Sequence, residues 1–172
     1  MAAERHGATA VCPGSYDPVT FGHLDIIGRA SEVFDKVLVG VVNQPVRKKK
    51  TVFDAGERVE FLERETENLG NVQVKAFDNL LVDFAREHGA KAIVKGLRAI
   101  SDFEYEFEMN QLNRKLAPDV DTVYLMASPQ YSFLSSSGVK EMATFGGDVT
   151  DLVPTPVAAR LKDALDRRYR SE

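Results

Sequence analysis

The sequence has a single cysteine and no tryptophan among its 172 residues. Because Cys12 has no cysteine partner within the chain, a reducing compartment such as the cytoplasm is expected. No apolar run approaches the roughly 18 residues that a membrane span requires. Residues 1–7 lack the apolar stretch of a signal peptide, so we expect them to be a ragged lead-in to the fold. No membrane association is predicted.

Basic residues are outnumbered by acidic ones, 22 to 26, which gives a net charge of −4. A slightly acidic domain lacks the basic face that nucleic acid binding requires, although a local basic cluster can still bind a small anion. The contents of apolar residues, 44%, and charged residues, 28%, are those of an ordinary globular protein and exclude a disordered chain or a coiled coil. The length predicts one domain, residues 1–172.

Apolar, β-rich runs alternate along the chain with longer stretches of helical period. The pattern predicts strands at 8–12, 37–42, 72–77, 92–94 and 122–126, and helices at 22–34, 54–69, 80–88, 101–116, 135–145 and 156–169. Asp54 with Glu57, and Ser101 with Glu104, have the spacing of capping boxes. The fold class expected is α/β: a Rossmann-like, doubly wound, five-stranded parallel sheet with helices on both faces and a C-terminal helix.

Distinctive polar residues gather where these strands end, and ligands of such sheets bind there. After the first strand, a loop containing Gly14 leads to His23 in the first turn of a helix. Unpaired N–H groups and the helix dipole favour an anion at such a position, and His23 would add a donor. The loop has neither the Walker pattern nor Gly-x-Gly-x-x-Gly. The alternative is an ordinary strand–helix turn in which His23 only caps the helix.

Two further segments offer groups that suit a phosphate-rich ligand. Lys95 and Arg98 are cations that follow an apolar strand, with Gly96 allowing close approach of a ligand to the backbone. Three consecutive serines at 135–137 precede a helical run, where they form either a simple cap or a nest of hydroxyl and N–H groups. The carboxylates Asp102 and Glu104 complement the dipole of a helix start, whereas Glu106 lies further into the helix.

Three motifs, taken together, resemble those of the bacterial phosphopantetheine adenylyltransferases, a family of the nucleotidyltransferase superfamily. They are Thr20-x-Gly22-His23, which looks like the T/HxGH motif, then Lys95-Gly96-Leu97-Arg98 with Asp102-Phe103-Glu104-Tyr105-Glu106, and finally Tyr131-Ser132-Phe133-Leu134-Ser135-Ser136-Ser137. The resemblance covers about residues 8–165. It implies transfer of an adenylyl group from ATP to 4′-phosphopantetheine, giving dephospho-coenzyme A and pyrophosphate. It also implies Mg²⁺ held mainly by the ATP phosphates, a homohexamer, and feedback inhibition by coenzyme A.

The resemblance assigns roles to individual residues. His23 is the expected catalytic residue, at the phosphates of ATP, and Ser15 and Tyr16 lie between the two substrates. The other residues expected to bind ATP are Gly96, Leu97, Arg98, Glu106, Tyr131, Ser132, Phe133, Leu134, Ser135, Ser136 and Ser137. Phosphopantetheine is expected to contact Ser15, Leu81 and Lys95.

One basic residue of the run 47–50 is also expected to bind phosphopantetheine. The family has a single key lysine there, and this loop is two residues longer than the common pattern. Counting from Pro45 selects Arg47, whereas counting back from Phe53 selects Lys49. Both residues remain candidates.

The chemistry of adenylyl transfer agrees with this set of residues. The nucleophile is a phosphate that is already ionised at neutral pH, so the reaction needs positioning and charge neutralisation and no general base. Cys12 is interpreted as a small buried residue and not as a nucleophile. Two alternatives remain: another small-molecule nucleotidyltransferase of the same fold, and a non-catalytic nucleotide-binding module.

Overall fold

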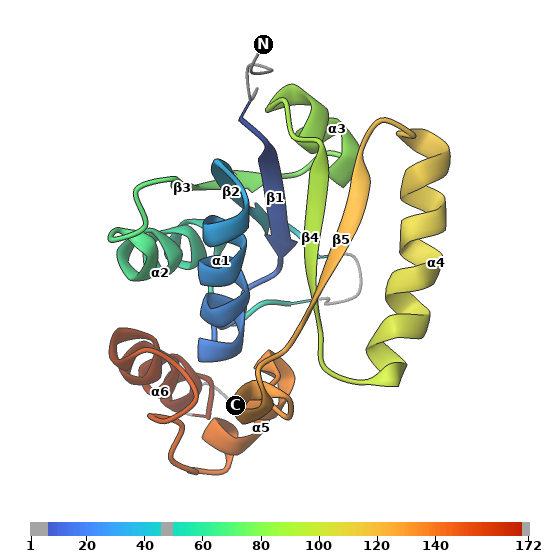
Figure 1. Ribbon diagram of the computed structural model, residues 1–172. Helices are drawn as coiled ribbons and strands as arrows, with labels where there is room; N and C mark the ends of the chain where they lie inside the picture. The colour runs from blue at the N-terminus through green and yellow to red at the C-terminus, as the bar shows by residue number, and fades with distance from the viewer. Residues whose placement is uncertain (1–6, 46–49, 170–172) are drawn as a thin grey trace.

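A computed structural model describes residues 7–45 and 50–169 of the chain. Its centre is a parallel sheet of five strands: β1 (Thr9–Gly14), β2 (Lys36–Val42), β3 (Val72–Phe77), β4 (Ala92–Leu97) and β5 (Asp121–Met126). The strands lie in the order β3-β2-β1-β4-β5 (Figure 1). The chain therefore reverses its direction of winding between β1 and β4, and a crevice opens at that point beyond the carboxyl ends of the strands.

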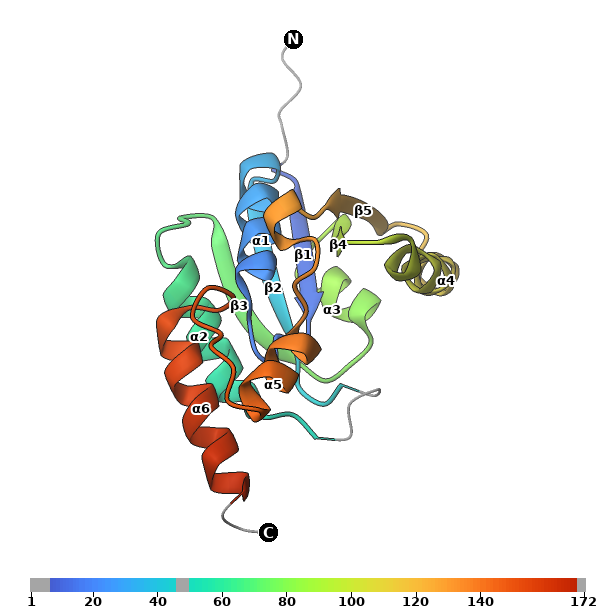
Figure 2. The ribbon, with the colours of Figure 1, turned by 90° about the horizontal axis from the view of Figure 1, so that it is seen from below.

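Helices cover both faces of the sheet, as the sequence predicts. They are α1 (Phe21–Val33), α2 (Ala55–Thr66), α3 (Leu81–Glu87), α4 (Ile100–Leu116), α5 (Ser136–Thr144) and α6 (Thr155–Tyr169), with a short 3₁₀ turn, η1 (Pro129–Tyr131). Figure 2 shows α1, α2 and α6 on one side of the sheet and α3 and α4 on the other. The expected fold class is confirmed.

Alternating side chains of the central strands build two separate cores. Ala10 and Cys12 of β1 pack with α1, α2 and α6, whereas Val11 between them packs with α3. Side chains of a strand point alternately to the two faces, so a strand buried on both faces is continuously apolar. This is why a central strand such as β2 could be recognised as an uninterrupted apolar run.

Two boundaries differ from the expectation in ways that affect the crevice. β1 continues to Gly14, which pairs with Val41, and β4 continues to Leu97, which pairs with Met126. Because β4 is longer, only Arg98 and Ala99 separate it from α4. The capping box predicted at Ser101 is therefore wrong: α4 starts at Ile100, and no side chain caps it.

The capping box predicted at Asp54 and Glu57 is confirmed. The Asp54 carboxylate accepts from the Glu57 N–H over 2.8 Å, and the Glu57 carboxylate accepts from the Asp54 N–H over 3.2 Å. α2 ends at Thr66, three residues before the predicted end at Leu69, and the Leu69 N–H then closes a turn onto the Thr66 carbonyl. No helix in the described ranges has both the length and the apolar character needed to cross a lipid bilayer.

Candidate active site

A cavity of about 330 Å³ lies at the carboxyl ends of β1 and β4, at the reversal of the strand order. Its walls come from the β1–α1 loop with the first turns of α1, from the end of β4 with the start of α4, and from the segment that leads into α5. Twelve of the predicted site residues line it: Ser15, Tyr16, His23, Lys95, Gly96, Arg98, Glu106, Tyr131, Leu134, Ser135, Ser136 and Ser137. The fold thus brings all three motifs to one cavity.

His23 is held by the start of its own helix. Its Nδ1 accepts a hydrogen bond of 3.0 Å from the Thr20 N–H, and its own N–H donates to the Thr20 hydroxyl over 3.3 Å. An accepting Nδ1 carries no proton, so the neutral ring carries its proton on Nε2. Capping and ligand binding are therefore compatible: Nδ1 caps the helix, and the ring lines the cavity with Nε2 as a donor.

Tyr16 lines the cavity, and its hydroxyl is already bonded to the backbone. The backbone there has φ 47°, the hydroxyl donates to the Cys12 carbonyl over 2.9 Å, and the side chain is buried. Its ring packs edge-on against the ring of His23, with the centroids 5.0 Å apart. Burial raises the pKa of the Tyr16 phenol well above its usual range. The aromatic ring thus supports the orientation of His23.

Each cation of the second motif forms an ion pair with a carboxylate of the same motif. Lys95 lies 3.5 Å from the Glu106 carboxylate, and Arg98 binds both oxygens of Asp102 at 2.9 and 3.1 Å. The pKa of the Asp102 carboxyl lies below its usual range, mainly because the Arg98 side chain donates hydrogen bonds to it. Arg98 also donates to the Leu134 carbonyl over 3.0 Å. This contact joins the second motif to the third.

Gly96 allows helix α1 to pack closely against β4. A Cβ atom at this position would lie 3.0 Å from Cγ1 of Ile26 on α1, a contact tighter than ordinary packing. The absence of a side chain therefore lets α1 sit close to β4. Gly96 also lines the cavity, so the expectation that it lets a ligand approach the backbone stays a prediction.

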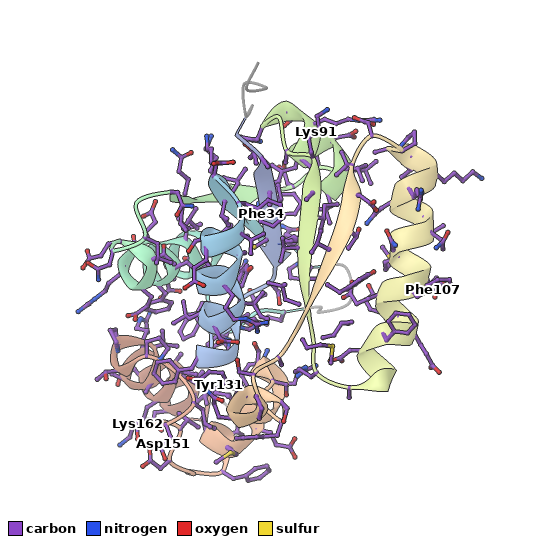
Figure 3. The ribbon with its side chains drawn as sticks, in the orientation of Figure 1. Phe34, Lys91, Phe107, Tyr131, Asp151 and Lys162 are labelled. Atoms are coloured by element: carbon purple, nitrogen blue, oxygen red, sulfur yellow. The ribbon has the colours of Figure 1, made fainter. Side chains whose placement is uncertain are left out.

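The three serines at 135–137 make different contacts. The Ser135 hydroxyl caps α5 by accepting from the Gly138 N–H over 3.0 Å, and the Ser136 hydroxyl donates to the Pro18 carbonyl over 2.8 Å. Ser137 is exposed at the cavity. Tyr131 lies beside the start of α1, near Gly22 (Figure 3). The helix start therefore remains available for an anion, with two of its hydroxyls used for positioning.

Four predicted residues lie outside the cavity lining. Leu97 is buried, and Ser132 is exposed, with its hydroxyl bonded to the Pro129 carbonyl. Phe133 is 72% exposed and borders a separate groove beside α5. Leu81, the first residue of α3, packs on the core of the opposite face. The remaining candidates, Arg47 and Lys49, lie outside the described residues.

Sequence reasoning missed a buried arginine that shapes the cavity. Arg58 of α2 is 1% exposed and donates to four carbonyl groups: Ser15 at 2.7 Å, Val42 at 2.8 Å, Asn43 at 2.9 Å and Asp54 at 3.1 Å. Burial, the largest influence, lowers the pKa of its guanidinium. In the sequence Arg58 looks like any charged residue of an amphipathic helix, so no local signal marks it.

Comparisons with known proteins agree with this geometry. Residues 11–142 match a protein-family model described as cytidylyltransferase-like. The chain is 51% identical over 162 residues to the phosphopantetheine adenylyltransferase of Clostridium kluyveri, a match that covers 94% of this chain and 98% of that protein. It is 52% identical over 158 residues to the phosphopantetheine adenylyltransferase of Rubrobacter xylanophilus, covering 92% and 95%.

A solved structure supports the fold independently. The crystal structure of a "Putative Nicotinate-nucleotide Adenylyltransferase" from Vibrio parahaemolyticus has a TM-score of 0.68 to this chain and covers 93% of it and 95% of that protein. The two sequences are 17% identical, so this likeness concerns the fold alone.

Proposed function

The chain belongs to the phosphopantetheine adenylyltransferases, and we propose that it transfers the adenylyl group of ATP to 4′-phosphopantetheine. The products are dephospho-coenzyme A and pyrophosphate. The observation that supports this proposal most directly is the convergence of His23, Lys95 and Arg98 on one cavity at the reversal of the strand order. The cavity combines a fixed donor with two cations, which is what phosphate transfer without a general base requires.

In the proposed step, a phosphate oxygen of phosphopantetheine attacks the α-phosphorus of ATP. The new P–O bond forms as the bond from the α-phosphorus to the bridging oxygen breaks, and pyrophosphate leaves with that electron pair. The attacking phosphate is already ionised, so no proton has to be removed from it. The work of the protein is to align the two phosphates and to stabilise the charge that develops.

Each wall of the cavity supplies one part of this work. His23 donates from Nε2 to the α-phosphate, with Nδ1 fixed by Thr20. Arg98 and the start of α5 hold the nucleotide, and Lys95 holds the phosphate of phosphopantetheine. Lys95 and Arg98 each have a carboxylate partner, and the phosphates of the substrates would share these cations with Glu106 and Asp102.

We propose that Mg²⁺ enters with ATP. Within residues 7–45 and 50–169, no three His, Cys, Asp or Glu side chains gather closely enough to hold a metal ion. Asp102 and Glu106, the carboxylates that line the cavity, are both paired with cations. A cavity of this kind fits an ion carried by phosphate oxygens and water, which would neutralise part of the triphosphate charge.

The test is an assay of pyrophosphate release with Mg²⁺, ATP and 4′-phosphopantetheine. We expect turnover that depends on both substrates, with dephospho-coenzyme A as the second product. Replacing ATP by CTP at the same concentration is the matched control and should leave little activity. Turnover with CTP in place of ATP would favour another nucleotidyltransferase, and nucleotide binding without turnover would favour a binding module.

We further propose that the chain forms a homohexamer in which α4 lies at an interface. Four large apolar side chains of α4 are about half exposed: Phe103 (46%), Phe107 (51%), Leu112 (50%) and Leu116 (54%). Figure 3 shows Phe107 on α4, across the molecule from α2 and α6. Phe103 and Phe107 are adjacent, with ring centroids 5.9 Å apart, and exposed apolar surface is typical of interaction sites. Light scattering should give six times the chain mass of 19.1 kDa, and Phe107→Glu should lower the assembly state.

Regulation and compartment follow from the same proposal. Coenzyme A contains the phosphopantetheine and adenylate parts of both substrates, so it should compete for the cavity as a feedback inhibitor. Raising either substrate concentration should relieve that inhibition. A cytoplasmic location suits an enzyme whose single thiol, Cys12, is buried and unpaired.

A further inference from the structure

Asp17 is a fully buried carboxylate with an unusual number of partners. Its side chain is 0% exposed. The N–H groups of Val52 and Phe53 donate to its oxygens at 3.0 Å, and Nζ of Lys140 lies 3.0 Å from Oδ2. Charges are rarely buried to this degree unless they are paired and hydrogen-bonded, because removing them from water is costly. One carboxylate thus joins three segments that lie far apart in the sequence.

Lys140 reaches Asp17 from the middle of α5. Its side chain is 20% exposed, and it lies one turn after the serines that begin the helix. Ser136 makes a second contact with the same segment, since its hydroxyl donates to the carbonyl of Pro18 over 2.8 Å. These two contacts fix α5 against the β1–α1 loop in both position and rotation.

The two joined segments both contribute residues to the cavity wall. Asp17 follows Ser15 and Tyr16 and precedes the capping box of His23. α5 begins with the serines that line the same cavity. The ion pair itself does not line the cavity, so any effect on the reaction must pass through the positions of these walls.

We propose that Lys140 and Asp17 are positioning residues that set the distance between the start of α5 and His23. This inference rests on the proposed function. When Lys140 is removed, Asp17 keeps its hydrogen bonds from Val52 and Phe53, so the β1–α1 loop stays anchored. The wall that loses an anchor is α5, which is the ATP side. The ion pair therefore acts on the use of ATP and not on that of phosphopantetheine.

Lys140→Met tests the proposal, because methionine keeps most of the volume and removes the charge. We expect the KM for ATP to rise about tenfold. This is a moderate effect, because a misplacement of about 1 Å in a substrate-binding group can lower the efficiency of an enzyme by about 10²-fold. The KM for 4′-phosphopantetheine should change less than about twofold, within the scatter expected for an untouched subsite. Lys140→Arg, which restores the cation, should recover most of the ATP affinity. Calorimetric titration with ATP alone compares the ATP affinities of the parent and the two variants without turnover.

Arg160→Met is the matched control. Arg160 of α6 forms an ion pair with Glu57 of α2 at 2.6 Å, and neither residue lines the cavity. This variant also loses one ion pair between helices, so it reports a general loss of stability. Both KM values should stay within about twofold of the parent. Should Lys140→Met fail to fold, Lys140→Gln, which keeps a donor for Asp17 without the charge, takes its place under the same criteria.

The outcomes separate the inference from the proposed function. A parent enzyme without adenylyl transfer would refute the proposed function, whatever the variants do. An active parent with an unchanged KM for ATP in Lys140→Met would overturn the inference alone. Equal increases in both KM values, or a loss that Lys140→Arg does not reverse, would also overturn it, because they would indicate a diffuse structural defect.

Discussion

Thr20 and His23 hold each other by reciprocal hydrogen bonds at the start of α1: the Thr20 N–H donates to Nδ1, and the His23 N–H donates to the threonine hydroxyl. This is a capping box in which histidine takes the place of the usual glutamate or glutamine. The arrangement assigns the two ring nitrogens different tasks. Nδ1 caps the helix, and Nε2 carries the proton that the ring can donate to a ligand.

His23→Ala should lower turnover by about 10²–10³-fold, by analogy with the loss of one oxyanion-hole donor. It should also lower the free energy of unfolding by about 1 kcal/mol, because the Thr20 N–H loses its acceptor. Steady-state kinetics and denaturant unfolding measure the two effects. His23→Gln is the control, since glutamine at this position retains the cap. It should keep the stability and lose the activity; turnover of either variant within twofold of the parent would refute the catalytic role.

Lys95→Ala and Arg98→Ala should affect different substrates. Lys95 lies within β4, two residues before its end, and is expected to bind phosphopantetheine, so its removal should chiefly raise the KM for that substrate. Arg98 lies further out and contacts the carbonyl of Leu134 in the ATP wall, so its removal should chiefly raise the KM for ATP. Initial rates with one substrate varied at a time give both values. A reversed pattern would mean that the two phosphate subsites have been exchanged.

Arg58→Met should be strongly destabilising. It would leave the carbonyls of Ser15, Val42 and Asn43 without their charged donor in a buried place. We expect a loss of about 3 kcal/mol or more in the free energy of unfolding, since hydrogen bonds to charged groups are each worth about 1.5–3 kcal/mol. Arg64→Met, at an exposed position of the same helix, is the control and should stay within about 0.5 kcal/mol. Equal effects would show that Arg58 does not organise the loops.

Cys12 should be inert towards thiol reagents in the folded protein. Burial raises the pKa of its thiol from 9.0 to about 12, so the reactive thiolate is scarce at mildly alkaline pH. Labelling with a disulfide reagent should require unfolding. Because the folded state holds this proton more tightly, the associated stability is complete below about pH 9 and is lost as the pH rises towards 12. Cys12→Ala should remove that part of the alkaline loss; labelling as fast as that of the unfolded chain would contradict the burial.

Single alanine changes across 47–50 should have unequal effects. If one cation binds the substrate phosphate, its loss should raise the KM for phosphopantetheine by an order of magnitude or more, since such a bond is worth about 1.5–3 kcal/mol. The other three should matter little, because exposed charges are screened. Arg47 and Lys49 are expected ahead of Lys48, with Lys50 last. Four small, equal effects that fade as salt rises would indicate only a diffuse attraction.

Much of the fold could be predicted because its signals are local. Apolar, β-rich runs marked the five strands, and Asp54 with Glu57 marked the start of α2. The error at Ser101 has a tertiary cause: pairing with β5 extends β4 to Leu97, and α4 then starts before the residue that looked like its cap. A sequence pattern contains no information about where a neighbouring strand stops pairing.

The sequence by itself determined the alternation of strands and helices, the motifs around His23, Lys95 and Ser135, and hence the resemblance to a family. These features depend on residues that are close together in the chain. Only the tertiary structure decided which serines serve the helix and the neighbouring loop, that Gly96 makes room for Ile26, and that Asp17, Arg58 and Lys140 hold the walls of the cavity. Asp17 and Lys140 are 123 positions apart. Their contact depends on burial and on the packing of three segments, and neither leaves a periodic or local trace in the sequence.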